Sequence, residues 1–303
     1  ILDALNNLQA GGSTAGGAGI QLAYRQALEN FKSEGNNRII LATDGDFNIG
    51  ASSNGEMQRL IEKKRDQGVF LTALGFGMGN YKDPKMETIA DQGNGNYAYI
   101  DNILEAKKVL VNEFGGTLFT IAKDVKLQVE FNPTKVAAYR LIGYENRMLQ
   151  DEDFNNDKKD AGELGSGHTV TALYEIIPAG IHSEFMPVDD LKYQHKNIKS
   201  SAQNSNELLT IKLRYKQPDG SKSKLISHPV IDQKTHLNNT SNNFKWSAAV
   251  AGFGMMLRDS AYKNDLSFDE VLRLARQGKG EDRDGYRIEF INLVQSCQLL
   301  AVK

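Results

Sequence analysis

The first third of the chain alternates helical and strand-like patterns of apolar residues. Apolar residues from Ile20 to Phe31 recur at the spacing of one helix face. RIILAT (38–43) and VFLTALGF (69–76) are short continuous apolar runs, typical of strands covered on both faces in a parallel sheet. Further elements are expected at 57–65 and 86–90 (helices) and 97–100 (strand). Strands alternating with helices of this length predict a doubly wound, mostly parallel α/β sheet.

One more helix is expected before the pattern changes at Gly115-Gly116. Its predicted apolar face carries Ile103, Ala106, Leu110, Val111 and Phe114. This face should pack on the sheet and complete the α/β domain, which we place at residues 1–117.

Beyond Gly116 the apolar period becomes two, as in half-buried strands. The strings with this pattern are VKLQVEF (125–131), AAYRLIGY (137–144), TVTALYEII (169–177) and LLTIKLRY (208–215). QPDGS (217–221) then supplies hairpin-turn residues. These strands predict an antiparallel, sandwich-like β domain over 118–235, with polar loops at 151–167 and 189–206.

Helical spacing returns in the last segment, 236–303. KWSAAVAGFGMMLRDSAY (245–262) is largely apolar, and Ser267 with Glu270 has the spacing of a capping box. A last helix is expected to begin near Tyr286. The third part of the chain is therefore predicted to be helical.

The composition of the chain limits the partners and the covalent links that it can have. The 303 residues are 40% hydrophobic and 24% charged, with 36 basic against 38 acidic side chains. A balance this close to neutral does not favour nucleic acid or anionic lipid as a partner. Cys297 is the only cysteine, so no disulfide within the chain is possible. The chain starts with Ile1 inside a helix-like pattern, and we expect the natural N-terminus to lie upstream.

Two oxygen-bearing side chains are predicted to meet at one edge of the sheet. Asp44 directly follows the strand 38–43, and Thr14 lies in the glycine-rich string GGSTAGGAGI before the first long helix. Open α/β sheets bind ligands at the carboxyl ends of their strands. Hydroxyl and carboxylate oxygens suit Mg²⁺, although a glycine-rich helix entry is also an ordinary cap.

The strings GGSTAGGAGIQLAY and RIILATDGDFNIG resemble the second and third metal-site segments of von Willebrand factor type A domains. The resemblance implies a metal-ion-dependent adhesion site (MIDAS) with Thr14 and Asp44 as ligands of Mg²⁺ or Mn²⁺. The family's first segment, Asp-x-Ser-x-Ser, does not precede Thr14 here. We therefore expect a type A domain without its first strands, and a cation site that is weak or absent in this chain.

Further strings, among them GFGMGNYKD, GNGNYAYID and DAGELGSGHTVTALYEI, resemble a bacterial subfamily of type A proteins with a poorly characterised C-terminal region. Members are typically envelope proteins, often lipoproteins. The resemblance implies an extracytoplasmic location, in periplasm or envelope, with membrane attachment only through an N-terminal anchor outside this chain.

Other features of the sequence allow three further interpretations. GFGMG (75–79) could cradle a phosphate, but its third glycine is one residue early for G-x-G-x-x-G. Asp151, Asp153, Asn155 and Asp157 begin like a calcium loop, yet Gly162 stands where a ligating Glu belongs, which excludes an EF-hand and leaves either an irregular, weak calcium loop or a solvated acidic loop. No nucleophile, base and orienting group can be named together, so we expect no enzyme.

Two functions follow as hypotheses. The first is a divalent-cation-dependent, adhesion-type module that binds an acidic side chain of a protein partner. The alternative is a structural or assembly protein of the cell envelope that needs no metal.

Overall fold

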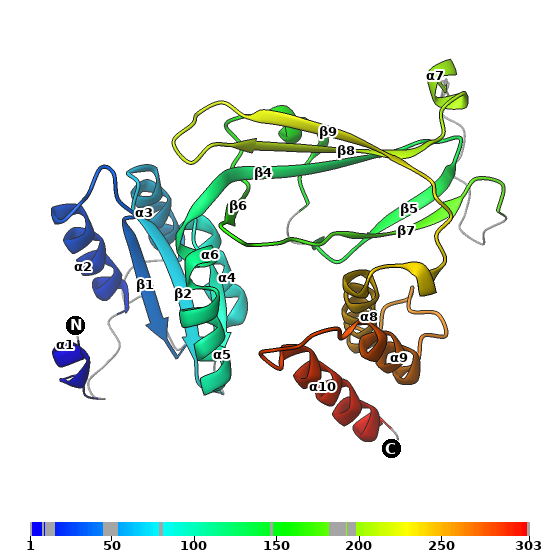
Figure 1. Ribbon diagram of the computed structural model, residues 1–303. Helices are drawn as coiled ribbons and strands as arrows, with labels where there is room; N and C mark the ends of the chain where they lie inside the picture. Colours follow the sequence, from blue (N-terminus) through cyan, green and yellow to red (C-terminus); the bar gives the residue numbers. More distant parts are fainter. Residues whose placement is uncertain are drawn as a thin grey trace. The chain divides into compact units, whose positions relative to one another are not determined.

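The computed structural model describes residues 2–7, 9, 16–44, 54–78, 81–145, 148–181, 192 and 198–301. Within these residues the chain forms two compact units. The first contains 1–126, 155–169 and 214–225, and the second contains 127–154, 170–213 and 226–303. Figure 1 shows the elements of both, and each unit is described separately.

A three-stranded parallel sheet organises the first unit. Its strands are β1 (Arg38–Thr43), β2 (Phe70–Phe76) and β3 (Tyr97–Ile100), in the order β1-β2-β3. Arg38 pairs with Phe70 and Thr43 with Gly75, so both strands end together at one edge. The predicted parallel α/β fold is confirmed.

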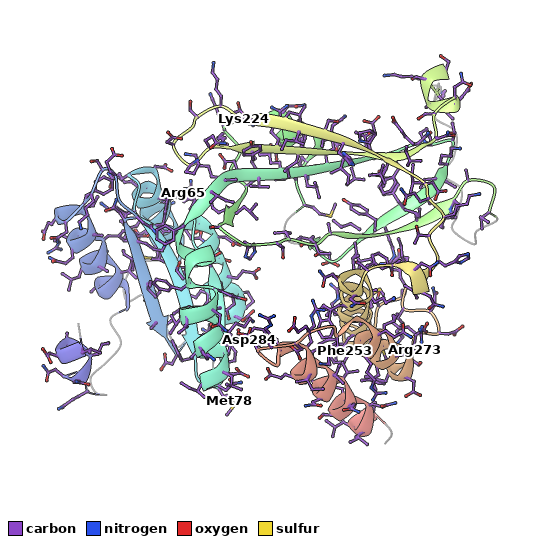
Figure 2. All side chains as sticks on the ribbon, in the orientation of Figure 1. Arg65, Met78, Lys224, Phe253, Arg273 and Asp284 are labelled. Carbon is purple, nitrogen blue, oxygen red and sulfur yellow. The ribbon has the colours of Figure 1, made fainter. Side chains whose placement is uncertain are left out.

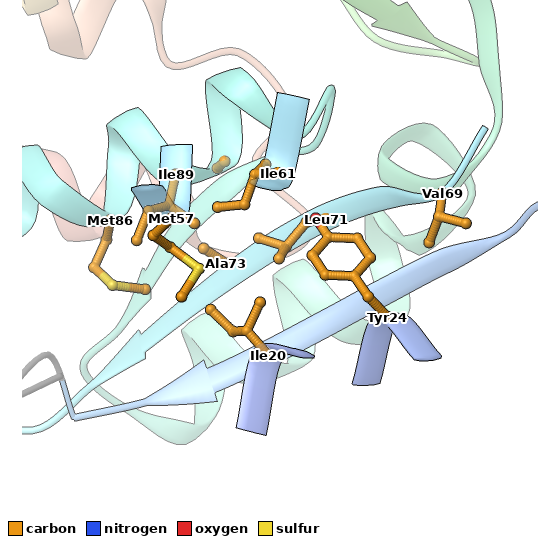
Figure 3. Packing of buried hydrophobic residues seen from close by; sticks show 10 residues of the cluster. Ile20, Tyr24, Met57, Ile61, Val69, Leu71, Ala73, Met86 and Ile89 are labelled. Atoms are coloured by element: carbon orange, nitrogen blue, oxygen red, sulfur yellow. The ribbon is translucent and has the colours of Figure 1, made fainter. Parts of the chain in front are cut away.

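Three helices cover the first face of this sheet: α2 (Gly16–Glu29), α3 (Asn54–Asp66) and α4 (Asp83–Gln92). Figure 3 shows how their apolar side chains meet the strand residues Leu71 and Ala73. The fully buried members include Ile20, Tyr24, Met57, Ile61 and Met86. This cluster is the main core of the first unit.

The second face is covered by α5 (Ile103–Lys107), the π-helical turn η1 (Lys108–Asn112) and α6 (Phe114–Leu118). Asn102 caps α5 by accepting hydrogen bonds from the Leu104 and Glu105 N–H groups at 2.8 and 2.9 Å. The core here is small: Leu74, Ile100 and Val109, with partly buried neighbours such as Ala106.

The predicted apolar face of the helix at 103–114 was only partly right: Ala106 packs against the buried cluster, but other members are exposed. Val109 is buried, whereas Ile103 and Val111 are 81% and 66% exposed. A π turn adds a residue per hydrogen-bonded turn and so rotates the following side chains about the axis. A regular 3.6-residue period therefore misassigned the residues from η1 onward, whereas Ile103 is exposed at the start of α5, before this turn.

Antiparallel sheets follow the parallel sheet along the chain, as predicted. One sheet has the order β6-β4-β8-β9 and the other pairs β5 with β7. Their bounds are β4 (Thr120–Phe131), β5 (Val136–Ile142), β6 (Gly162–Gly165), β7 (Leu173–Pro178), β8 (Glu207–Lys216) and β9 (Lys224–Ile231). The Gly220 N–H donates to the Gln217 carbonyl oxygen at 2.9 Å, which closes the predicted turn between β8 and β9.

Short helical pieces complete the described chain: α1 (Leu2–Asn6), η3 (Asp151–Asn155), α7 (Ser200–Gln203) and η4 (Leu237–Asn239). The predicted loop at 151–167 thus contains η3 and β6, because Phe154 is buried and β6 pairs with β4. The described part of the predicted loop at 189–206 contains α7.

Three helices form the core of the second unit: α8 (Asn242–Leu257), α9 (Phe268–Gly278) and α10 (Tyr286–Ala301). Ser267 caps α9 by accepting from the Glu270 N–H at 3.2 Å, as the capping-box spacing predicted. Phe253, Val271 and Val294 are among the buried residues that the helices share. None of the described helices is long and apolar enough to cross a bilayer.

Candidate functional site at the carboxyl edge of the parallel sheet

Asp44 directly follows β1 and is exposed. Because Thr43 pairs with Gly75, the residues after β1 and β2 are neighbours at this edge. A Cβ atom added to Gly77 would stand 3.8 Å from the Asp44 Cβ atom. The structure therefore places the predicted carboxylate where the ends of two strands meet, beside a residue without a side chain.

Gly77 is fixed beside Asp44 by its backbone and by a tyrosine. Its φ of +84° is a conformation that favours glycine. The Tyr99 hydroxyl donates a hydrogen bond to the Gly77 carbonyl oxygen. The next residue, Met78, is almost fully exposed, and Figure 2 shows it at the carboxyl end of the sheet. This turn thus places an exposed backbone segment beside the Asp44 carboxylate.

A chain of hydroxyl groups borders the same edge. The Tyr81 and Tyr97 hydroxyl oxygens are 2.8 Å apart, and the Tyr97 hydroxyl donates to the Asp83 carboxylate. Burial raises the pKa of Tyr97, and the hydrogen bonds with Asp83 and Tyr81 raise it further. These phenols stay neutral at physiological pH and serve as fixed hydrogen-bonding groups.

Gly75 is required for this arrangement. A Cβ atom on Gly75 would stand 1.7 Å from the Tyr81 hydroxyl oxygen, so Tyr81 occupies the space of the missing side chain. Within GFGMG, Gly75 thus allows packing against Tyr81 and Gly77 forms a turn beside Asp44. The next helix, α4, begins only at Asp83, so Gly75 and Gly77 do not lead directly into a helix N-terminus as a phosphate loop would.

The second predicted ligand, Thr14, lies outside the described residues, as does most of the segment after Asp44. Across the described residues, no group of three or more His, Cys, Asp and Glu side chains is arranged to hold a metal ion. Mg²⁺ prefers about six oxygen ligands, several of which may be water. Asp44 fits as one such ligand, but the described residues do not by themselves complete a magnesium site.

Sequence reasoning missed the tyrosines and Asp83. Their signal was present in the chain, because Tyr97 and Tyr99 alternate along a short strand and Tyr81 follows the glycine turn. Nothing in that pattern showed that the hydroxyl groups would meet, since Tyr81 and Tyr97 belong to different elements.

The acidic loop that resembled a calcium loop has another arrangement. The Lys126 ammonium donates to the Asn156 carbonyl oxygen and the Lys216 ammonium to that of Asp157, both at 2.6 Å. Asp151 and Asp153 belong to η3. Lysine ammonium groups thus bind main-chain oxygens that a calcium ion would attract.

Two family models match the chain. The von Willebrand factor type A domain matches residues 1–111, and the family described as "Uncharacterized protein YfbK, C-terminal" matches residues 116–300. The sequence is 44% identical over 292 residues to "Uncharacterized protein YfbK" of Escherichia coli strain K12, which covers 96% of this chain and 50% of that protein. The chain therefore spans about half the length of this curated relative.

Solved structures are similar over parts of their length. A von Willebrand factor type A protein from Catenulispora acidiphila has 17% identity and a TM-score of 0.37, covering 92% of this chain and 64% of the other. BatB from Bacteroides thetaiotaomicron has 22% identity and a TM-score of 0.29, covering 35% of this chain and 60% of the other.

Proposed function

The chain belongs to the family in which a von Willebrand type A domain precedes the YfbK C-terminal region, and we propose that it is a protein-binding module. Type A domains generally mediate protein–protein interactions. We assign the binding surface to the carboxyl edge of the β1-β2-β3 sheet, because open α/β sheets bind ligands there.

The position of Asp44 carries this proposal. Its carboxylate is exposed at the end of β1, beside Gly77, which has no side chain. The Tyr99 hydroxyl holds the Gly77 carbonyl oxygen by a hydrogen bond, and the Tyr81 and Tyr97 hydroxyl groups bond to each other nearby. A partner that binds beside Gly77 meets a backbone that is already held in place, which lowers the entropic cost of binding.

The proposed interaction depends on a divalent cation. Asp44, with Thr14 and residues beyond those described, would bind Mg²⁺ or Mn²⁺ in the natural full-length protein. When bound, the cation would supply an open coordination position for an acidic side chain of the partner. We further propose that the protein works outside the cytoplasm and catalyses no reaction.

The test compares two aspartates at the same edge. Asp44 follows β1 and Asp101 follows β3, and both are exposed. The full-length protein and its Asp44→Ala and Asp101→Ala variants are immobilised, and envelope proteins are captured in Mg²⁺ or in EDTA. We expect specific capture that requires Mg²⁺, disappears with Asp44→Ala and persists with Asp101→Ala.

The two hypotheses separate in this experiment. Capture that resists both EDTA and Asp44→Ala would overturn the cation-dependent mechanism and favour the metal-independent structural role. Direct titration of Mn²⁺ by electron paramagnetic resonance gives a second readout, in which Asp44→Ala should weaken binding at least tenfold.

A further inference from the structure

Three carboxyl groups converge at the opposite end of the first unit, where β1 and β2 begin. They are Asp124 of β4, Asp160 before β6 and Glu163 within β6, and we call them the carboxyl cluster. Arg65, which pairs with Asp160, lies at the far end of the sheet from Met78 in Figure 2. The cluster is therefore separate from the site at Asp44.

Asp124 is held in an unusual backbone conformation. Its φ is +51°, and the pairing of β4 with β6 is irregular between Ala122 and Val125. Such a bulge redirects a side chain at a cost in backbone energy. Here it lets the Asp124 Oδ1 atom accept from the Ala161 N–H at 3.2 Å, while Oδ2 accepts from the Lys216 ammonium.

Several polar contacts around this cluster attach segment 155–169 to the rest of the unit, beside other contacts such as the Ser166 N–H to the Phe119 carbonyl oxygen. Lys126, only 2% exposed, and Lys216 donate to main-chain oxygens of this segment. The Arg65 guanidinium donates to the Asp160 carboxylate at 2.7 Å. The pairing of β6 with β4 adds only a few ladder positions, with two irregularities.

Asp160 lies beside Asp124, whose Oδ1 atom accepts from the N–H group of Ala161, the residue after Asp160. Burial and the neighbouring Asp124 raise the pKa of Asp160, against the opposing charge of Arg65. The closed arrangement therefore favours the protonated form of Asp160.

Glu163 is the group most sensitive to pH. Its Oε1 atom is buried without a hydrogen-bond partner among the described residues. Burial, and then the charges of Asp124 and Asp160, raise its pKa to about 8, although Lys123 and Arg38 act in the opposite direction. One Arg38 guanidinium nitrogen donates to the Thr72 hydroxyl at 2.8 Å, while the Arg38 Nε atom is buried without a hydrogen-bond partner among the described residues.

We propose that the carboxyl cluster is an alkaline-sensitive latch, which holds segment 155–169 against β4 while Glu163 is protonated and releases it when that proton is lost. The closed state requires a neutral Glu163, because a carboxylate there would be buried beside two other acidic groups. In the open state water solvates all three groups, and the repulsion disappears.

The direction in which pH shifts the balance of open and closed states follows from which state binds more protons. Glu163 has a pKa of about 8 when closed, against an ordinary value of 4.5, so the closed state binds more protons between these values. The closed state is fully stabilised below pH 4.5 and loses this stabilisation as the pH rises to about 8. Within this window each pH unit raises the ratio of open to closed molecules by up to about tenfold.

Hydrogen–deuterium exchange tests the latch in the full chain. Exchange of peptides from 155–169 is measured at pH 6 and pH 9 and corrected for the intrinsic pH dependence of amide exchange. We expect the corrected opening of this segment to increase at least tenfold between the two conditions. Glu163→Gln should remove most of the increase, because its side chain stays neutral at both pH values.

Glu152→Gln is the matched control, since Glu152 is an exposed glutamate in η3, outside the cluster. It should behave like the wild type. Corrected exchange that is equal at both pH values in the wild type, or an increase that persists in Glu163→Gln, would overturn the latch. Should Glu163→Gln fail to fold, carbon-13 NMR titration of wild-type Glu163 decides, because a pKa near 4.5 contradicts the proposal.

Discussion

The two faces of the β1-β2-β3 sheet differ sharply in how they are covered. On the first face, Leu71 is 0% exposed within a cluster to which three helices contribute. On the second face, Leu74 is buried by α5 and η1, but Ile40 of β1 is 46% exposed. Ile40 pairs with Thr72 and Ala42 with Leu74, so they share the second face.

Within the described residues, helices cover the first face of this parallel sheet well and the second face only in part. Parallel strands normally have helices on both faces. Here the helical cover of the second face lies over β2 and β3, so the strand that carries Asp44 is exposed at Ile40. Most of the stability of this unit should therefore come from the first face.

The largest effect is expected on the first face. Leu71→Ala removes a fully buried side chain from a rigid cluster and should cost about 3–5 kcal/mol of unfolding free energy. The measurement is a urea titration read by hydrogen–deuterium exchange of β2 peptides. A cost below about 1 kcal/mol would mean that this cluster is not the main core.

Leu74→Ala is the matched change on the second face of the same strand. Leu74 is 4% exposed, but its cluster is small and close to solvent. We expect a cost of about 2 kcal/mol, because such a site collapses or hydrates more easily than a deep one. The same titration should rank Leu74→Ala below Leu71→Ala; the reverse order would refute the contrast between the faces.

Tyr24→Phe is expected to stabilise the first face. The Tyr24 hydroxyl is buried without a hydrogen-bond partner among the described residues, and burial raises its pKa. Removing an unsatisfied polar group should add about 1 kcal/mol. Tyr97→Phe is the control and should destabilise, since it removes a hydroxyl with partners. A loss of stability in Tyr24→Phe would show that its hydroxyl is satisfied.

Ile40→Thr should have the smallest effect. Thr keeps the β-branched shape that suits a strand, and Ile40 is already half exposed. We expect a change within about 0.5 kcal/mol in thermal or urea unfolding. A cost above about 2 kcal/mol in the full-length protein would instead show that another segment covers this face.

Much of the α/β region could be predicted from the sequence because its signals are local. The continuous apolar strings of β1 and β2 identified buried parallel strands, and Asp44 followed from the end of one of them. The helix at 103–114 was found but its buried face was partly misassigned, because a π turn is not visible in a 3.6-residue period. The division into 1–117, 118–235 and 236–303 stays a prediction.

The candidate site was only partly predictable. Asp44 could be predicted because it follows a strand-like apolar string in the sequence. The contact between the Tyr81 and Tyr97 hydroxyl groups depends instead on how two parts of the chain fold together. The carboxyl cluster is a stronger case, since Asp124 and Lys216 are 92 positions apart. In the sequence, Glu163 is an ordinary glutamate in a polar stretch.

The sequence alone determined the order and type of the main elements, the balance of charge and the position of the aspartate at the end of β1. These are consequences of side-chain period and turn chemistry over a few residues. Only the tertiary structure decided which face of the sheet is covered, which hydroxyl groups lie near the Asp44 edge and which carboxyl groups lie together. Burial and charge repulsion depend on neighbours in space, and those neighbours come from distant parts of the chain.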